Sequence, residues 1–190
     1  MAEEENRRRG MRADALRSRG RLLESAAELI ARDGTGVSLE EIAREAGVGS
    51  ATLHRHFPTR WNLLESIFKD RADQIAQQAD ELMADDPNVA FASWFSALVD
   101  MANRTSGLAA VIGPPPDDQA SDMPSCHDVI AGAGGRLLHV GKTSGDIRAD
   151  IQIDELMAMA MAISSLPDRD ARNRLLEITV NGWGQPFPGP

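Results

Sequence analysis

Residues 38–65 read SLEEIAREAGVGSATLHRHFPTRWNLLE, and this stretch is the most informative about the fold. Ser38 is followed three residues later by Glu41, which is the capping box that opens a helix. Gly47 ends this first short helix, and the spacing predicts a second short helix over about 50–55. Two short helices joined by a glycine turn are typical of a helix-turn-helix.

The second helix of such a pair lies in the major groove of DNA. Ala43 is small where the two helices would cross, and Val48 and Leu53 would fill the core between them. The outward residues are short, polar or cationic, as contact with base edges requires. They are Ser50, Ala51, His54 and Arg55, with Thr52 near the helix start. Arg55 is long enough to bind guanine through two hydrogen bonds.

Helical periodicity extends through the rest of the chain, without any long strand pattern. One apolar stripe predicts a first helix that ends at Asp33-Gly34, with Leu16, Leu22, Leu23, Ala26, Ala27, Leu29 and Ile30 inward. Asp86-Pro87 is a cap followed by proline at the first helical position. Further helices are predicted over about 59–84, from 87, over 106–112, 123–141, 152–165 and 168–183, with a loose tail over 185–190.

Charge is unevenly distributed along the chain, although the net charge is -9. Residues 1–60 carry +1 and residues 61–190 carry -10, and seven arginines fall within 7–21. We expect residues 1–13 to form a flexible basic arm. Its arginines either lie along the DNA backbone, enter the minor groove or are simply solvated; they are Arg7, Arg8, Arg9 and Arg12.

Several classes of protein do not fit the sequence. Cys126 is the single cysteine, and no apolar run approaches the roughly 20 residues of a membrane helix. No apolar stretch follows the N-terminal arginines, so we expect a cytoplasmic protein rather than a secreted one. The four histidines (54, 56, 127 and 139) do not form a ligand set, and no catalytic signature is present. We therefore expect no enzyme, no cofactor and no metal.

Residues 38–65 resemble the signature of the TetR family of transcription regulators, T-x-x-x-I-A-x-x-A-G-V-S-x-G-T-L-Y-x-H-F-x-x-K-x-x-L. The resemblance covers about 14–65, and the second half resembles the SbtR-like C-terminal domains in layout. It implies an all-α, TetR-like fold of about nine helices, in which a helix-turn-helix domain over 14–60 precedes a ligand-binding and dimerisation domain over 61–190. This sequence departs from the usual signature at Gly49 (Ser), Ala51 (Gly), His54 (Tyr) and Arg60 (Lys).

The resemblance also implies roles for individual residues of the helix-turn-helix domain. Phosphates would be held by Ser38, Thr52, His54, His56 and Arg60, while Ser50, Ala51 and Arg55 would face base edges. Two simpler interpretations stay open, because Ser38 can serve only as a helix cap and His56 can serve only to close its helix against the core.

In the second half, the resemblance implies a dimer face on the last two helices and an enclosed ligand pocket. Candidate dimer residues are Met157, Ala160, Met161, Ser164, Leu175, Ile178, Thr179 and Gly182, which can alternatively pack inside one chain. Candidate ligand-binding residues are Trp94, Phe95, Leu98, Met101, Val111, His127, Ile130 and Met157, which can equally be plain core. The glycine-rich run 131–135 allows a close approach to another helix or to a ligand, or marks a kink.

The sequence therefore predicts a homodimeric, sequence-specific DNA-binding regulator. The form we favour is a repressor released from a palindromic operator by a small apolar or amphipathic ligand. The alternatives are an enzyme, an interaction module that has lost DNA binding, and an activator or ligand-independent regulator. Arg55, Arg60 and the basic arm disfavour the interaction module.

Overall fold

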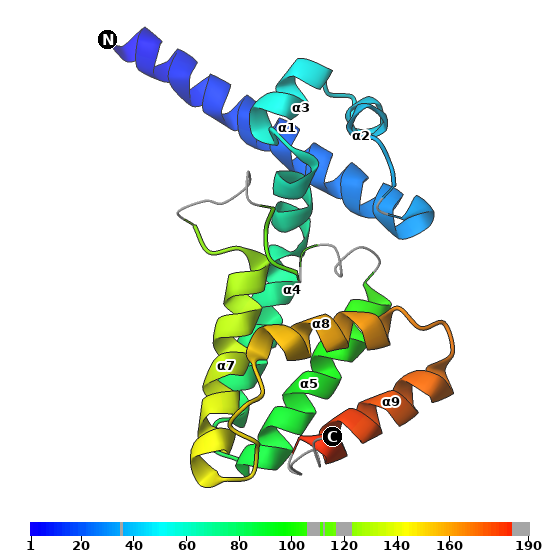
Figure 1. Cartoon of the computed structure of the whole chain (residues 1–190). Coiled ribbons are helices and arrows are strands. Elements are labelled where there is room, and N and C mark those ends of the chain that lie inside the picture. Colours follow the sequence, from blue (N-terminus) through cyan, green and yellow to red (C-terminus); the bar gives the residue numbers. More distant parts are fainter. Residues whose placement is uncertain (35, 106–110, 112, 117–122, 184–190) are drawn as a thin grey trace. The chain divides into compact units, whose positions relative to one another are not determined.

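The computed structural model describes residues 1–34, 36–105, 111, 113–116 and 123–183. Within these ranges the chain forms helices and no strand, so the expected all-α fold is confirmed (Figure 1). None of the helices described is both long and apolar enough to cross a membrane. The helix expected over 106–112, apart from Val111, and the tail over 185–190 lie outside the described residues.

The chain divides into two compact units, residues 1–67 and 68–190, and each is described by itself. The first unit contains α1 (Ala2–Asp33), α2 (Leu39–Glu45), α3 (Ser50–His56) and the beginning of α4 (Arg60–Leu82). Both α2 and α3 pack on α1. Their shared core consists of Leu22, Ala26, Leu29, Val37, Ile42, Ala43, Ala46, Val48, Leu53, Phe57 and Leu63.

The N-terminal segment differs from the sequence prediction. Residues 2–13, expected to form a flexible arm, lie in α1. Glutamate, arginine and alanine are strong helix formers, and the glutamates at 3–5 lie at the positive end of the helix dipole. The prediction that Leu16 belongs to the core is wrong, because its side chain is 71% exposed. The stripe that packs on α2 and α3 begins only at Leu22.

The second unit contains the rest of α4 together with α5 (Pro87–Arg104), α7 (Cys126–Ser144), α8 (Ile153–Ser164) and α9 (Arg169–Gly182). In this unit α5 packs on both α7 and α8, while α9 packs on α8. The predicted cap at the start of α5 is confirmed. The Asp86 carboxylate accepts hydrogen bonds from the backbone N–H groups of Asn88 and Val89 at 3.1 and 3.2 Å.

A glycine of α7 allows the close helix contact that the run 131–135 suggested. A Cβ atom placed on Gly134 would lie 2.1 Å from the indole of Trp94, which is fully buried. The Trp94 indole also donates from Nε1 to the backbone carbonyl of Ile75 in α4, at 3.1 Å. This tryptophan therefore joins α5 to both α4 and α7.

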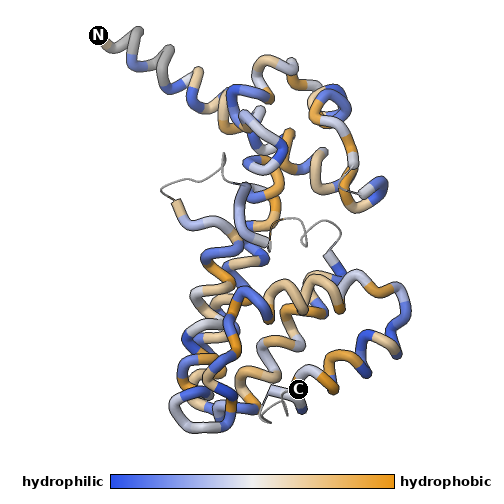
Figure 2. Tube along the Cα trace, in the orientation of Figure 1, coloured by the Kyte–Doolittle hydropathy of each residue, from blue (hydrophilic) through white to orange (hydrophobic). Residues whose placement is uncertain are grey.

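The end of α9 is held against α5 by a second buried tryptophan. The Trp183 ring makes edge contacts with Phe91 and Phe95, with ring centroids 5.0 and 5.7 Å apart. Its Nε1 donates to the side-chain oxygen of Asn88 at 2.9 Å. The hydropathy pattern agrees with this packing, since α5 and α8 are the more apolar helices of the unit (Figure 2).

Candidate nucleic-acid interface

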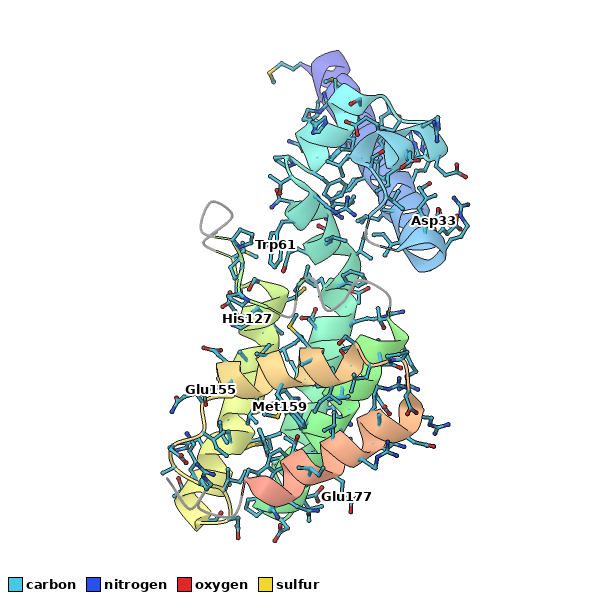
Figure 3. All side chains as sticks on the ribbon, turned by 45° about the vertical axis from the view of Figure 1, so that its right-hand side comes forward. Asp33, Trp61, His127, Glu155, Met159 and Glu177 are labelled. Atoms are coloured by element: carbon cyan, nitrogen blue, oxygen red, sulfur yellow. The ribbon has the colours of Figure 1, made fainter. Side chains whose placement is uncertain are left out.

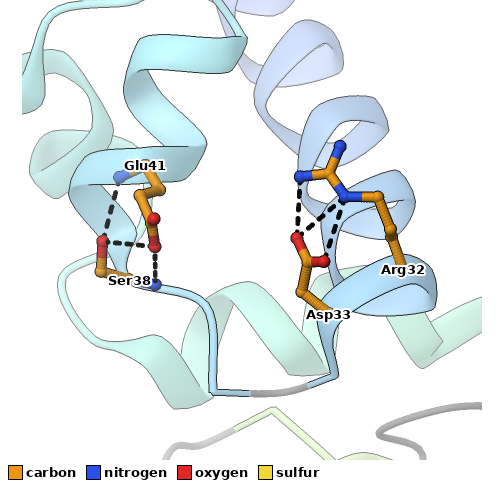
Figure 4. Close-up of polar contacts among 4 residues, drawn as sticks. All are labelled: Arg32, Asp33, Ser38 and Glu41. Atoms are coloured by element: carbon orange, nitrogen blue, oxygen red, sulfur yellow. Dashed lines mark hydrogen bonds and ion pairs between the residues drawn. The ribbon is translucent and has the colours of Figure 1, made fainter.

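The start of α2 is fixed by the predicted capping box, which is confirmed (Figure 4). The Ser38 hydroxyl accepts from the backbone N–H of Glu41 at 3.1 Å, and the Glu41 carboxylate accepts from the Ser38 N–H at 3.0 Å. The Ser38 hydroxyl also donates to that carboxylate, at 3.1 Å. These hydrogen bonds from the Ser38 backbone and hydroxyl hold the pKa of Glu41 below its ordinary value.

The turn between α2 and α3 is tight because Gly47 adopts the left-handed conformation, with φ of 60°. The chain then returns at once to the core, and the Val48 N–H donates to the Ala43 carbonyl at 2.9 Å. Ala43, Val48 and Leu53 are all buried, as the sequence predicted. This packing sets the direction in which α3 presents its outer face.

The outer face of α3 contains the residues predicted to read bases. The side chains of Ser50, Ala51, His54 and Arg55 are all exposed, while Leu53 between them is buried. Residues separated by three or four positions share a helix face, so Ser50 and Ala51 lie one turn from His54 and Arg55. The structure therefore brings these four predicted residues together on one accessible surface.

Two further predicted contacts on α3 are less accessible. Thr52 and His56 are half-buried. Nε2 of His56 is buried and makes no hydrogen bond to any residue described, and the imidazole lies 6.3 Å from the Phe57 ring, centroid to centroid. This placement favours the simpler interpretation that His56 closes α3 against the core.

Arg60 is the first residue of α4, and its guanidinium contacts the loop that leads into α2. Nη1 of Arg60 donates to the Val37 carbonyl at 2.6 Å, one residue before the Ser38 cap. The N-terminus of α4 is capped by Thr59, whose hydroxyl accepts a hydrogen bond from the Asn62 N–H at 3.3 Å. A guanidinium has five N–H donors, so this bond is compatible with a phosphate contact.

Sequence reasoning gave no role to Arg19 of α1, which contacts the end of α3. Its guanidinium carbon lies 5.3 Å from the centroid of the Phe57 ring, over its face, and its Nη2 donates to the Ser66 hydroxyl at 3.1 Å. Phe57 is the C-cap of α3. The run of seven arginines was the available signal, but composition alone does not distinguish a packed arginine from a solvated one.

The predicted ligand-binding residues lie in the core of the second unit. Trp94, Phe95, Leu98, Val111 and Ile130 are fully buried, Met157 is almost so and Met101 is half-buried. His127 is also buried, at the first turn of α7, with Nε2 3.5 Å from the Asp154 carboxylate of α8 (Figure 3). These residues form packed core in this structure.

Part of the predicted dimer face is buried within the chain, and part of it is exposed. Met157, Ala160 and Ser164 of α8 are buried within the chain, so the prediction is wrong for them. They face inward because α8 packs on α5 and α7.

On α9, by contrast, Leu175, Ile178 and Gly182 are exposed, and Thr179 is half-buried. Met159, on the outer side of α8, is 41% exposed and accepts a hydrogen bond at Sδ from the Thr179 hydroxyl at 3.3 Å (Figure 3). A groove of about 520 Å³ lies between α8, α9 and the loop 148–151, and Met159 and Ile178 line it.

Comparison with protein families gives two matches that together span most of the chain. Residues 22–67 match the family described as bacterial regulatory proteins of the tetR family. Residues 86–184 match the C-terminal domain of SbtR-like transcriptional regulators. The first match contains α2, α3 and the turn between them, and the second contains α5 and α7 to α9.

Individual proteins show the same likeness. A solved TetR transcriptional regulator from Streptomyces coelicolor is 31% identical, with 87% of this chain and 97% of that chain covered and a TM-score of 0.52. RolR, solved with its ligand resorcinol, is 21% identical, with 90% of each chain covered and a TM-score of 0.63, which is a likeness in fold.

Nucleoid occlusion factor SlmA of Yersinia enterocolitica is 29% identical over 87 residues, which are 45% of this chain. Those residues span 41% of the length of that curated relative.

Proposed function

We propose that this chain, which belongs to the TetR family of bacterial transcription regulators, is a homodimeric repressor that a small ligand releases from a palindromic operator. The observation that carries the DNA-binding part is the outer face of α3. Four exposed residues of suitable chemistry lie there, on a helix whose buried side is fixed by Leu53 and by the Gly47 turn. Such a helix can enter the major groove.

Within that face, Arg55 makes the bidentate contact with guanine, and Ser50, Ala51 and His54 lie against neighbouring base edges or backbone. Thr52 in the first turn of α3 and Arg60 at the start of α4 complete the phosphate contacts, while His56 closes α3 against the core. Ser38 contributes mainly as a cap, because its single hydroxyl proton is already donated to Glu41. Phosphate contacts of this kind position the protein, and base contacts give specificity.

The dimer forms through the exposed side of α9 together with the outer side of α8. No residue of α9 itself is buried in the single chain, although Leu175 and Ile178 are apolar and exposed. Apolar residues clustered on one helix side indicate an interaction surface. A two-fold dimer presents two copies of α3, which can read two half-sites about one helical turn or more apart.

The ligand enters the apolar core of the second unit, near Trp94 and Met157. Methionine adapts to irregular ligands, and the Trp94 indole is bonded to α4 through the Ile75 carbonyl. The division between the two units falls within α4, which therefore contributes residues to both. Displacing Trp94 would thus act directly on the helix that begins at Arg60. RolR with resorcinol supports only that this fold can take up a small ligand.

Release from the operator requires that the ligand bind more tightly to the released state than to the DNA-bound state. A hundredfold loss of operator affinity corresponds to about 2.7 kcal/mol of difference in ligand binding between the two states. A small-molecule panel screened by thermal unfolding would find the ligand, since ligand at a hundred times its Kd stabilises the folded state by about 2.7 kcal/mol. A hit that raises the melting temperature but leaves operator affinity unchanged would refute induction by that ligand.

The DNA-binding part is tested by selecting sequences from a random-sequence DNA library with the purified protein. The proposal predicts enrichment of an inverted repeat, with half-site centres separated by about one helical turn, 10 bp, or more. Enrichment of a single half-site without symmetry would refute the dimeric mode of reading. No enrichment above the starting library would refute sequence-specific DNA binding.

A further inference from the structure

We infer that the N-terminal half of α1 is a helical strut that binds DNA phosphates outside the half-site read by α3. This inference rests on the proposed function and extends it to a second contact surface. It differs from the arm that the sequence suggested, because residues 2–13 continue α1 without a break. A continuous helix cannot follow the narrow minor groove as an extended arm does, but it can lie across the backbone.

The first observation is the position of Arg19, which fixes how this half of α1 is turned. Arg19 lies over Phe57, the residue that caps α3. The face of α1 that contains Arg19 is therefore directed to the end of the reading helix. At 3.6 residues per turn, Arg12 lies on the same face, about two turns and 10 Å towards the N-terminus. Arg9 follows about one turn further out, turned by about 80° from the direction of Arg19.

The second observation is the accessibility of that face. Arg9 and Arg12 are both exposed, and Leu16 between Arg12 and Arg19 is also exposed. The N-terminal turns of α1 extend beyond α3 (Figure 1), and the described residues there are mostly hydrophilic (Figure 2). Exposed cations on the helix against which the DNA-reading helix packs complement the phosphate backbone in charge. An axial reach of about 15 Å from Arg19 corresponds to roughly half a turn of the duplex.

The nearby acidic groups do not cancel this surface. Asp14 is paired with Arg17, on a different side of α1 from Arg9 and Arg12. Glu5 lies on the same side of α1, one turn beyond Arg9, but it is a single carboxylate beside the two cations of Arg9 and Arg12. The exposed cations on the strut are therefore directed to the duplex that flanks the half-site, rather than to its base edges.

The experiment measures the salt dependence of operator affinity on two duplexes. One duplex ends at the outer edges of the selected half-sites, and the other continues for about one turn, 10 bp, on each side. Affinity is measured by fluorescence anisotropy from about 50 to 200 mM KCl, where the log–log slope reports about 0.9 per phosphate contact. The variants are Arg9→Gln with Arg12→Gln, and Arg9→Lys with Arg12→Lys.

On the extended duplex, the glutamine variant should flatten the slope by up to about 3.6, because a dimer loses four cations. The lysine variant should keep the slope of the unmodified protein, and on the short duplex all three proteins should agree. The control removes two exposed arginines from the second unit, Arg71→Gln with Arg104→Gln, and should leave both slopes unchanged. Helix content is checked by circular dichroism, since glutamine keeps helix propensity.

An unchanged slope for the glutamine variant on the extended duplex would overturn the inference. Equal flattening on both duplexes would also overturn it, because the arginines would then act inside the half-site. If the unmodified protein shows no preference for the operator over random DNA, the proposed function itself fails, which is a different result.

Discussion

At the scale of single residues, several side chains that we propose to lie near DNA also hold the helix-turn-helix domain together. Arg60 donates to the Val37 carbonyl, and Ser38 is engaged on both its hydroxyl and its backbone N–H by Glu41. Arg19 joins α1 to the C-terminal end of α3 through Phe57. A loss of operator affinity on mutating one of these residues therefore does not by itself identify a DNA contact. The salt slope separates the two roles, because only a lost phosphate contact flattens it.

In the second unit, Gly134 is the residue whose replacement should be most informative. Gly134→Ala places a methyl group against the fully buried Trp94 indole, and overpacking of this kind costs about 1–3 kcal/mol. Gly132→Ala is the matched control, since it lies in the same helix with no atom within 4 Å of the added Cβ. The control should stabilise the protein by up to about 1 kcal/mol. Urea unfolding measures both, and equal effects would contradict the packing described.

At the scale of helices, the local patterns allowed most elements to be predicted. The capping box at Ser38, the glycine turn at Gly47 and the Asp86-Pro87 start each depend on residues within a few positions of one another. The start of the first helix was misjudged, because the run of arginines was interpreted as a solvated arm although the helix propensity of residues 2–13 favours a helix. The inward direction of Ala160 was also misjudged, because it depends on which neighbour α8 packs against.

The parts of the candidate site that depend on local patterns were also predictable from the sequence, and the contacts between distant residues were not. The outward residues of α3 follow from the buried position of Leu53 in the same short helix. The contact between Arg19 and Phe57 joins residues 38 positions apart, and no spacing rule relates them. The burial of His56 Nε2 likewise depends on how α3 meets the core, which a sequence pattern does not specify.

The capping box of α2 should make the stability of the helix-turn-helix domain sensitive to acid. Because the pKa of Glu41 is held below its ordinary value, its contribution to stability is complete above the usual carboxyl pKa, about 4.3. That contribution is lost as the pH falls through the lower pKa of the folded state. Glu41→Gln keeps an acceptor for the Ser38 N–H but does not titrate, so its stability should fall less steeply below about pH 4.

Glu40→Gln is the matched control for this measurement, because it removes one carboxylate from the same first turn without affecting the capping box. Urea unfolding followed by circular dichroism over a pH series gives the three profiles. Profiles for Glu41→Gln and Glu40→Gln that coincide would show that the capping box has no part in the acid response. Ser38→Ala, which removes the cap itself, should cost about 1 kcal/mol.

At the scale of the whole molecule, the proposed binding of a dimer to two half-sites would depend on the surface of α9. Ile178→Glu places a carboxylate in the proposed interface, where an unpaired buried charge costs about 3 kcal/mol or more. Dimer affinity should then fall at least about a hundredfold, which sedimentation velocity measures directly. Val89→Glu is the control, since Val89 is similarly exposed but lies on α5. A dimer of unchanged affinity in the Ile178 variant would place the interface elsewhere.

If the exposed face of α3 reads DNA sequence, removing Arg55 should weaken the preference for the operator. Fluorescence anisotropy compares affinity for the selected operator with affinity for a scrambled duplex of equal length, for the unmodified protein, Arg55→Ala and the exposed control Arg44→Ala on α2. The account predicts that Arg55→Ala loses about 1–3 kcal/mol of the preference, while Arg44→Ala retains it. Equal affinity of the unmodified protein for both duplexes, or an unchanged preference in Arg55→Ala, would contradict it.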